Sequence, residues 1–199
     1  MVRKTPTYEA AAMKTTLYID SCAWNYLHDN NVDLSTELPT DQYAIRLTSE
    51  VEIEVSKIPD DKRSLKEYIQ TSIHKNSITT TRVFGFLTLE PDGTPSKTQV
   101  YGGFNQGTFQ SEEDRQYYAS SDTKKYLIGK KPTNSGLGKN QADASLAVRA
   151  TNSVIITNEE PNKSGPLRSA AQSGGKIVYL RAEVEPSGLP LGKYLASII

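Results

Sequence analysis

The feature that most constrains this sequence is a strand–helix–strand pattern in its last third. Residues 153–157 (SVIIT) are typical of a buried strand, and 166–172 (PLRSAAQ) form a short helix that ends before two glycines. Residues 176–180 (KIVYL) are a second strand. A helix and short links between two strands make a βαβ unit, whose strands run parallel. The sequence therefore predicts an α/β fold with a parallel sheet.

The remaining pattern fits one domain of this class, as the length of 199 residues also favours. We expect a strand at 16–19, after which Asp20 or Ser21 caps a short helix. Further amphipathic helices are expected at 65–74 and 142–150 from their apolar spacing.

The segment YAIRLTSEVEIEV (43–55) is compatible with two structures. Its three glutamates alternate with apolar residues, which is a strand pattern. The Thr-Ser pair within it is also a good helix cap, with acidic residues following in the first turn. We favour a strand over 43–47 and a helix from about Ser49, which puts Glu50 and Glu54 on one helical face. In the strand alternative, all three glutamates share a face.

The domain is expected to span 13–182. A poorly packed extension (1–12) precedes it, and a tail (183–199) that crosses the surface before a final short turn follows it. An insertion at about 79–135 contains PDGTPSKT (91–98), which has the turn chemistry of a β-hairpin loop.

Composition excludes several classes of protein. Lys plus Arg and Asp plus Glu are both 23, so the net charge of zero argues against a strongly basic binder. The single Cys22 excludes an internal disulfide and a site with several cysteine ligands. No apolar run approaches the roughly 20 residues of a membrane span, and the N-terminus lacks the apolar core of a secretory signal. We therefore expect a soluble, cytoplasmic protein without membrane partners.

Acidic residues stand where the predicted elements meet the edge of the sheet. They are Asp20, Glu50 or Glu54, Asp143, Glu159 and Glu160. Ligands of an open parallel sheet bind outside the carboxyl ends of its strands, so these side chains are expected to converge. Carboxylate oxygens suit Mg²⁺ or Mn²⁺, and their mutual repulsion calls for a cation. Such a metal can orient a phosphodiester and activate a water molecule.

Several segments together resemble a PIN-like domain, a metal-dependent nuclease family. They are LYIDSCAW (17–24), LTSEVEIEV (47–55), QADASLAVRA (141–150) and SVIITNEE (153–160) followed by PLRSAAQSGGKIVYL (166–180). The resemblance implies a three-layer α/β/α sandwich with a central, mainly parallel sheet, and a ribonuclease that uses Mg²⁺ or Mn²⁺.

The resemblance also assigns catalytic, metal-binding residues. Asp20, Asp143 and Glu159 match three of the family's acidic positions, with glutamate at 159 where aspartate is common. Glu54 matches the acid after the second strand, with Glu50 as the alternative. The supporting residues are Ser21, Glu50, Thr157, Asn158 and Glu160.

Lysines close to Asp143 in sequence form a candidate rim for nucleic-acid phosphates, although solvated loop lysines are the alternative. They are Lys124, Lys125, Lys130, Lys131 and Lys139.

These expectations combine into an endoribonuclease that prefers RNA to DNA. It fits the toxin of a toxin–antitoxin pair, with an antitoxin or another regulator as partner, and family resemblance allows a homodimer. The alternative is a catalytically degenerate PIN-like module that binds nucleic acid or acts as a scaffold. A phosphate-binding loop of the GxxxxGK[ST] type is not in the sequence.

Overall fold

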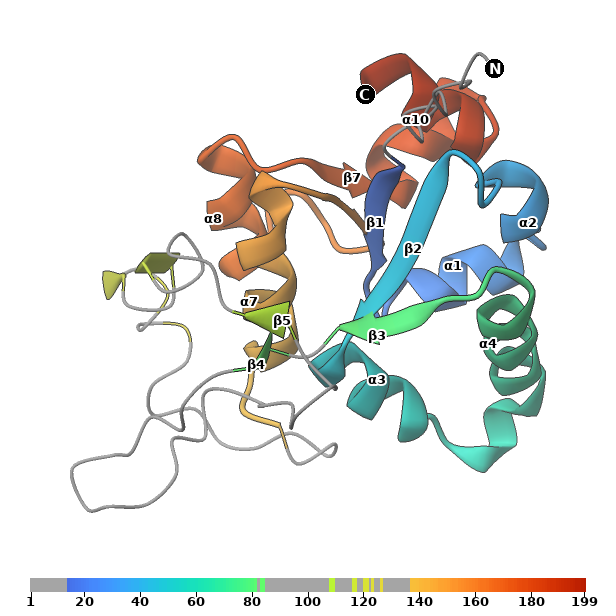
Figure 1. Cartoon of the computed structure of the whole chain (residues 1–199), viewed down its shortest axis with the longest axis horizontal. Coiled ribbons are helices and arrows are strands. Elements are labelled where there is room, and N and C mark those ends of the chain that lie inside the picture. Colours follow the sequence, from blue (N-terminus) through green and yellow to red (C-terminus); the bar gives the residue numbers. More distant parts are fainter. Residues whose placement is uncertain are drawn as a thin grey trace, which may run out of the picture.

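A computed structural model describes residues 14–81 and 137–199, together with 83–84, 108–109, 116–117, 120–121, 123 and 126. A five-stranded sheet lies at the centre, with strand order β3-β2-β1-β6-β7 and every pair parallel (Figure 1). Its strands are β1 (Thr15–Ile19), β2 (Tyr43–Thr48), β3 (Thr79–Thr81), β6 (Val154–Thr157) and β7 (Ile177–Tyr179). The prediction of an α/β fold with a central parallel sheet is confirmed.

Helices lie on both sides of this sheet (Figure 1). On one side are α7 (Gln141–Ala147), which continues as a 3₁₀ turn over Val148–Thr151, and α8 (Pro166–Gln172). The other side carries α1 (Ala23–Asp29), α2 (Leu34–Glu37) and α4 (Arg63–Lys75), which follows a 3₁₀ turn at Asp60–Lys62. The helix α3 (Ser49–Ser56) leaves the end of β2. A separate pair of parallel strands comprises β4 (Val83–Phe84) and β5 (Thr108–Phe109).

The core forms where the apolar strands meet these helices. All four residues of β6 are buried, and Leu17 and Ile19 of β1 are completely inaccessible to solvent. Trp24 and Leu27 of α1 are likewise fully buried. Since parallel strands covered on both faces are continuously apolar, the short runs TLYI and VIIT were sufficient to locate β1 and β6.

The ambiguous segment resolves as a strand followed by a helix. The Thr48 hydroxyl accepts a hydrogen bond from the Val51 N–H at 3.2 Å and so caps α3. This cap satisfies a backbone donor that a helix would otherwise leave unpaired. The predicted helix start at Ser49 is confirmed, and the alternative with all three glutamates on one strand face is wrong.

Two local predictions are corrected, and two others cannot be compared with the described residues. The residue preceding α1 is Cys22, and neither Asp20 nor Ser21 caps that helix with its side chain. Residues 79–81, expected in a hairpin-containing insertion, instead form the edge strand β3, whose Thr81 pairs with Thr48 in register. The hairpin loop at 91–98 and the extension 1–12 lie outside the described residues.

The tail does not simply cross the surface. After β7 the chain forms a π-helical turn (Leu180–Val184), then α9 (Glu185–Ser187) and α10 (Leu191–Ile198). Leu191 and Leu195 lie one helical turn apart and are buried against the core. Their spacing signals an amphipathic helix, which the surrounding prolines and glycines concealed in the sequence. Among the described residues, no helix is long and apolar enough to cross a membrane.

The strand order places a switch point between β1 and β6. From β1 the chain adds β2 and β3 on one side, and it later returns to add β6 and β7 on the other. Helices on opposite faces therefore diverge at the carboxyl ends of β1 and β6, the usual ligand position in open α/β sheets. The Asp20 N–H donates to the Ile156 carbonyl at 2.9 Å, which fixes these two strand ends side by side.

Candidate functional site

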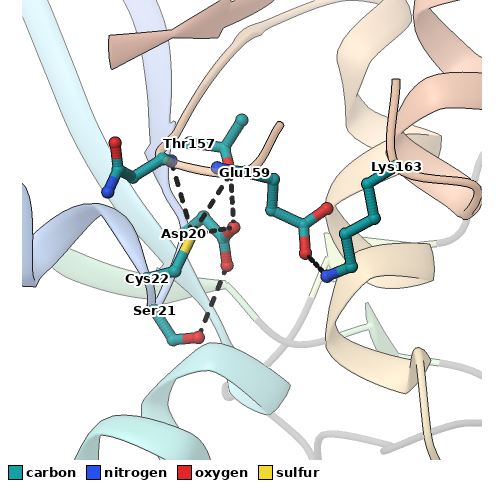
Figure 2. Close-up of polar contacts among 7 residues, drawn as sticks. Asp20, Ser21, Cys22, Thr157, Glu159 and Lys163 are labelled. Atoms are coloured by element: carbon teal, nitrogen blue, oxygen red, sulfur yellow. Dashed lines mark hydrogen bonds and ion pairs between the residues drawn. The ribbon is translucent and has the colours of Figure 1, made fainter. Parts of the chain in front are cut away.

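Asp20 lies at the switch point, directly after β1, and hydrogen bonds hold its side chain in place. Its side chain is only 2% exposed, and one carboxylate oxygen, Oδ2, accepts from the Thr157 hydroxyl at 2.7 Å and from the Cys22 thiol at 3.0 Å (Figure 2). The other oxygen, Oδ1, has a longer contact of 3.5 Å with the Ser21 hydroxyl. Asp20 is thus held in one orientation, with Oδ1 less engaged than Oδ2.

Thr157 connects Asp20 to the acid that follows β6. Its hydroxyl donates to Asp20 and accepts the Glu159 N–H at 3.1 Å, while the residue is fully buried. The Asn158 N–H donates to the Cys22 sulfur at 3.3 Å, so the turn after β6 is bonded to the turn after β1. Burial is the main cause that raises the pKa of Cys22, with the Asp20 charge adding to it, so the thiol serves as a neutral hydrogen-bond donor.

Replacing Thr157 with valine keeps the shape but removes the hydroxyl. Because a buried carboxylate and a backbone N–H each lose a partner, we expect the free energy of unfolding to fall by about 1–3 kcal/mol. Urea unfolding measures this change. Thr157→Ser retains the hydroxyl and should be destabilised less. Equal stability of the valine variant and the parent would show that these hydrogen bonds do not organise the site.

Glu159 forms an ion pair with Lys163, and Figure 2 shows the two side chains pointing toward each other. The Glu159 side chain is 15% exposed and that of Lys163 is 56% exposed. Burial lowers the pKa of Lys163, but the hydrogen bond and charge of Glu159, together with Asp143, raise it overall. An ammonium group therefore already neutralises part of the acidic cluster.

Asp143, on the first turn of α7, shares the electrostatic field of this cluster. Burial raises its pKa to about 7, and the charges of Asp20, Glu159 and Glu54 add to the increase. Burial also raises the pKa of Glu54, which Asp20 and Glu159 raise further, while a hydrogen bond from Ser21 lowers it. Acids from four separate parts of the chain thus influence one another, as the topology predicts.

The contacts distinguish Glu54 from Glu50. Glu50 is 6% exposed and hydrogen-bonded to Ser145 and Thr48, and the positive charge of Arg149 acts on it. Burial raises its pKa despite these partners. Glu50 therefore belongs to a buried polar connection between α3 and α7, whereas Glu54 interacts with Ser21 and Asp20. The geometry favours Glu54 as the second acid of the site.

Two other residues predicted for the site, Glu160 and Lys139, make no hydrogen bond or ion pair with its four acids in the part of the chain that the structure describes. Glu160 is exposed, and its backbone carbonyl accepts from the Lys163 N–H at 3.0 Å. Lys139 is exposed just before α7. The remaining rim lysines, Lys124, Lys125, Lys130 and Lys131, lie outside the described residues, so their role stays a prediction.

Sequence reasoning missed two participants, the Cys22 thiol as a partner of Asp20 and Lys163 as a partner of Glu159. A cysteine two residues after a strand-end acid, and a lysine four residues after another, are weak signals. Both contacts depend on the path of a turn, which residue spacing alone does not determine.

The donor chemistry fits Mg²⁺ or Mn²⁺, because the four acids supply hard oxygen ligands and the buried Asp20 makes no ion pair with any residue that the structure describes. Within the described ranges, however, no group of three or more His, Cys, Asp or Glu side chains is placed so that it could hold a metal ion. The acids are electrostatically coupled without forming a closed ligand set.

Comparison with known protein families finds no family model that matches this sequence. Comparison with curated proteins finds no match either. The PIN-like resemblance therefore remains a prediction.

Proposed function

We propose that this protein is a divalent-metal-dependent endonuclease whose substrate is RNA. The proposal is supported by the position of four acids, Asp20, Glu54, Asp143 and Glu159, near the switch point of a parallel sheet, where their charges raise the pKa of Glu54 and Asp143. Clustered carboxylates in a partly buried site are costly unless a cation compensates them, and such sites are common where function requires them.

The four acids are the residues that would hold Mg²⁺ or Mn²⁺, and because the described side chains do not form a closed ligand set, some of them would have to turn toward the ion as it binds. When bound, the ion would polarise the scissile phosphate and lower the pKa of a water molecule. Thr157 and Cys22 keep Asp20 in one orientation, which limits the loss of side-chain freedom on binding. Lys163 would exchange Glu159 for a phosphate oxygen of the substrate and stabilise negative charge there.

Cleavage of a single-stranded RNA by the purified chain tests this proposal. We expect cleavage with Mn²⁺ or Mg²⁺, none in excess EDTA, and slower cleavage of a DNA strand of the same sequence. Absence of metal-dependent cleavage on a panel of RNA and DNA substrates would overturn it. A toxin role, control by an antitoxin and a cytoplasmic location are further parts of the proposal, as is a homodimer.

A second candidate is a catalytically degenerate module that binds nucleic acid. The Lys163–Glu159 ion pair favours it, because an internal cation already occupies one of the acids. Calorimetric titration with Mn²⁺ separates the candidates. A catalytic site should bind the ion in a manner that depends on Asp20 and Asp143, whereas a degenerate module should not.

A further inference from the structure

A cleft of about 490 Å³ opens beside the acidic cluster. It lies between the start of α1, the end of α3 and the beginning of α4. Ser21, Cys22 and Glu54 line it, so the cleft and the candidate site share a wall. Its volume falls within the roughly 300–1,000 Å³ of typical small-molecule sites.

The residues that line the cleft are of three chemical kinds. Asn25 presents an exposed amide, and Lys57 and Lys62 supply two positive charges. Val55, Ile58 and Leu65 contribute apolar surface. A ligand that matches this lining has an apolar part with hydrogen-bonding edges, and negative charge.

The two lysines are available for such a ligand. Both are exposed, and within the described part of the chain neither makes an ion pair. Lys66, in the first turns of α4, differs because its ammonium contacts the Asp60 carboxylate at 2.5 Å. Lys57 and Lys62 therefore carry positive charge at the cleft that no ion pair among the described residues neutralises.

We propose that this cleft binds the nucleotide adjacent to the scissile phosphodiester of a single-stranded RNA, an inference that rests on the proposed function. Val55, Ile58 and Leu65 contact the base, and the Asn25 amide hydrogen-bonds its edge. Lys57 and Lys62 bind the next phosphate groups. The strand must be single because a base can enter the cleft only when it is free of a helical stack.

Binding measured without cleavage tests the inference. In the Asp143→Asn background, hexamers of A, C and U with a fluorescent label are titrated by anisotropy over a range of salt concentrations. Adding Lys57→Gln and Lys62→Gln should weaken binding about tenfold at low salt. The slope of log affinity against log salt should decrease by about 1.4, or about 0.7 for each lost phosphate contact on a single strand.

Two further variants define the specificity of the effect. Lys75→Gln removes an exposed lysine at the far end of α4 and should leave affinity and slope unchanged. Asn25→Leu should reduce the differences in affinity among the three hexamers, because the base edge loses its hydrogen-bonding partner.

The outcomes separate this inference from the proposed function. Metal-dependent cleavage by the parent chain, combined with unchanged RNA binding in the double lysine variant, would overturn the cleft assignment and leave the nuclease proposal intact. Loss of RNA binding in that variant without cleavage by the parent would support the cleft in a non-catalytic module. Equal effects of Lys75→Gln and the double variant would also overturn the assignment, because they would indicate general charge attraction.

Discussion

Replacing Asp143 with asparagine should reduce metal-dependent RNA cleavage by at least about a hundredfold in kcat/KM. Loss of even an indirect partner of a metal ligand typically costs about 10–100-fold, and Asp143 is proposed to contact the ion directly. Asparagine has nearly the same size, so the packing of α7 should be preserved. The measurement is the initial rate of cleavage of a labelled RNA at saturating Mn²⁺.

Asp41→Asn is the matched control, because Asp41 is an exposed aspartate in the turn before β2. It should cleave RNA at the parental rate. If Asp143→Asn retained full activity in a preparation free of other nucleases, Asp143 would not be part of the active site.

The same substitution should also stabilise the protein, and increasingly so as the pH rises. Asp143 has a pKa of about 7 in the folded chain, against an ordinary value of 3.8. Between these values the folded state retains a proton that the unfolded state has lost, so the free energy of unfolding of the parent decreases with pH. Above pH 7 Asp143 is ionised in both states, so the destabilisation that it causes no longer changes with pH. At 1.36 kcal/mol per pKa unit, this destabilisation is at most about 4 kcal/mol.

Urea unfolding in EDTA at pH 5 and pH 8.5 measures this difference. The asparagine variant should be more stable than the parent by about 2–4 kcal/mol at the higher pH and by less at the lower pH. Asp41→Asn should track the parent at both. Adding Mn²⁺ should reduce this difference in stability, because the ion binds the folded parent through its carboxylates and so stabilises the parent more than the variant. If the asparagine variant were no more stable than the parent at pH 8.5, burial and the neighbouring carboxylates would not raise the pKa of Asp143.

Much of the fold could be predicted because its elements are short and strongly patterned. The βαβ unit was evident from two apolar strands and PLRSAAQ, and the predicted helix at 166–172 matches α8 residue for residue. The strand β3 was missed because three threonines suit a hairpin as well as a sheet edge. Only their pairing with β2, a long-range contact, decides between the two.

The sequence predicted which acids influence one another electrostatically, since the topology of a parallel sheet brings strand ends together, while their role as a joint metal site stays a prediction. The site was not predictable to the level of individual partners. Glu50 and Glu54 lie one turn apart on α3, and their spacing cannot show which one faces Ser145 and which one faces Ser21. Burial and the position of α7 separate them, and both arise from packing over long sequence distances.

The contact between β1 and β6 joins segments synthesised far apart in time. On the ribosome, β1, β2 and β3 emerge first and can pair while one edge of β1 still lacks its neighbour. Until Thr157 has been translated and β6 has docked, the carboxylate of Asp20 lacks the 2.7 Å hydrogen bond from the Thr157 hydroxyl that orients Oδ2. If the chain is the nuclease proposed above, a nascent chain would therefore lack a fully oriented Asp20 until its last third has been released.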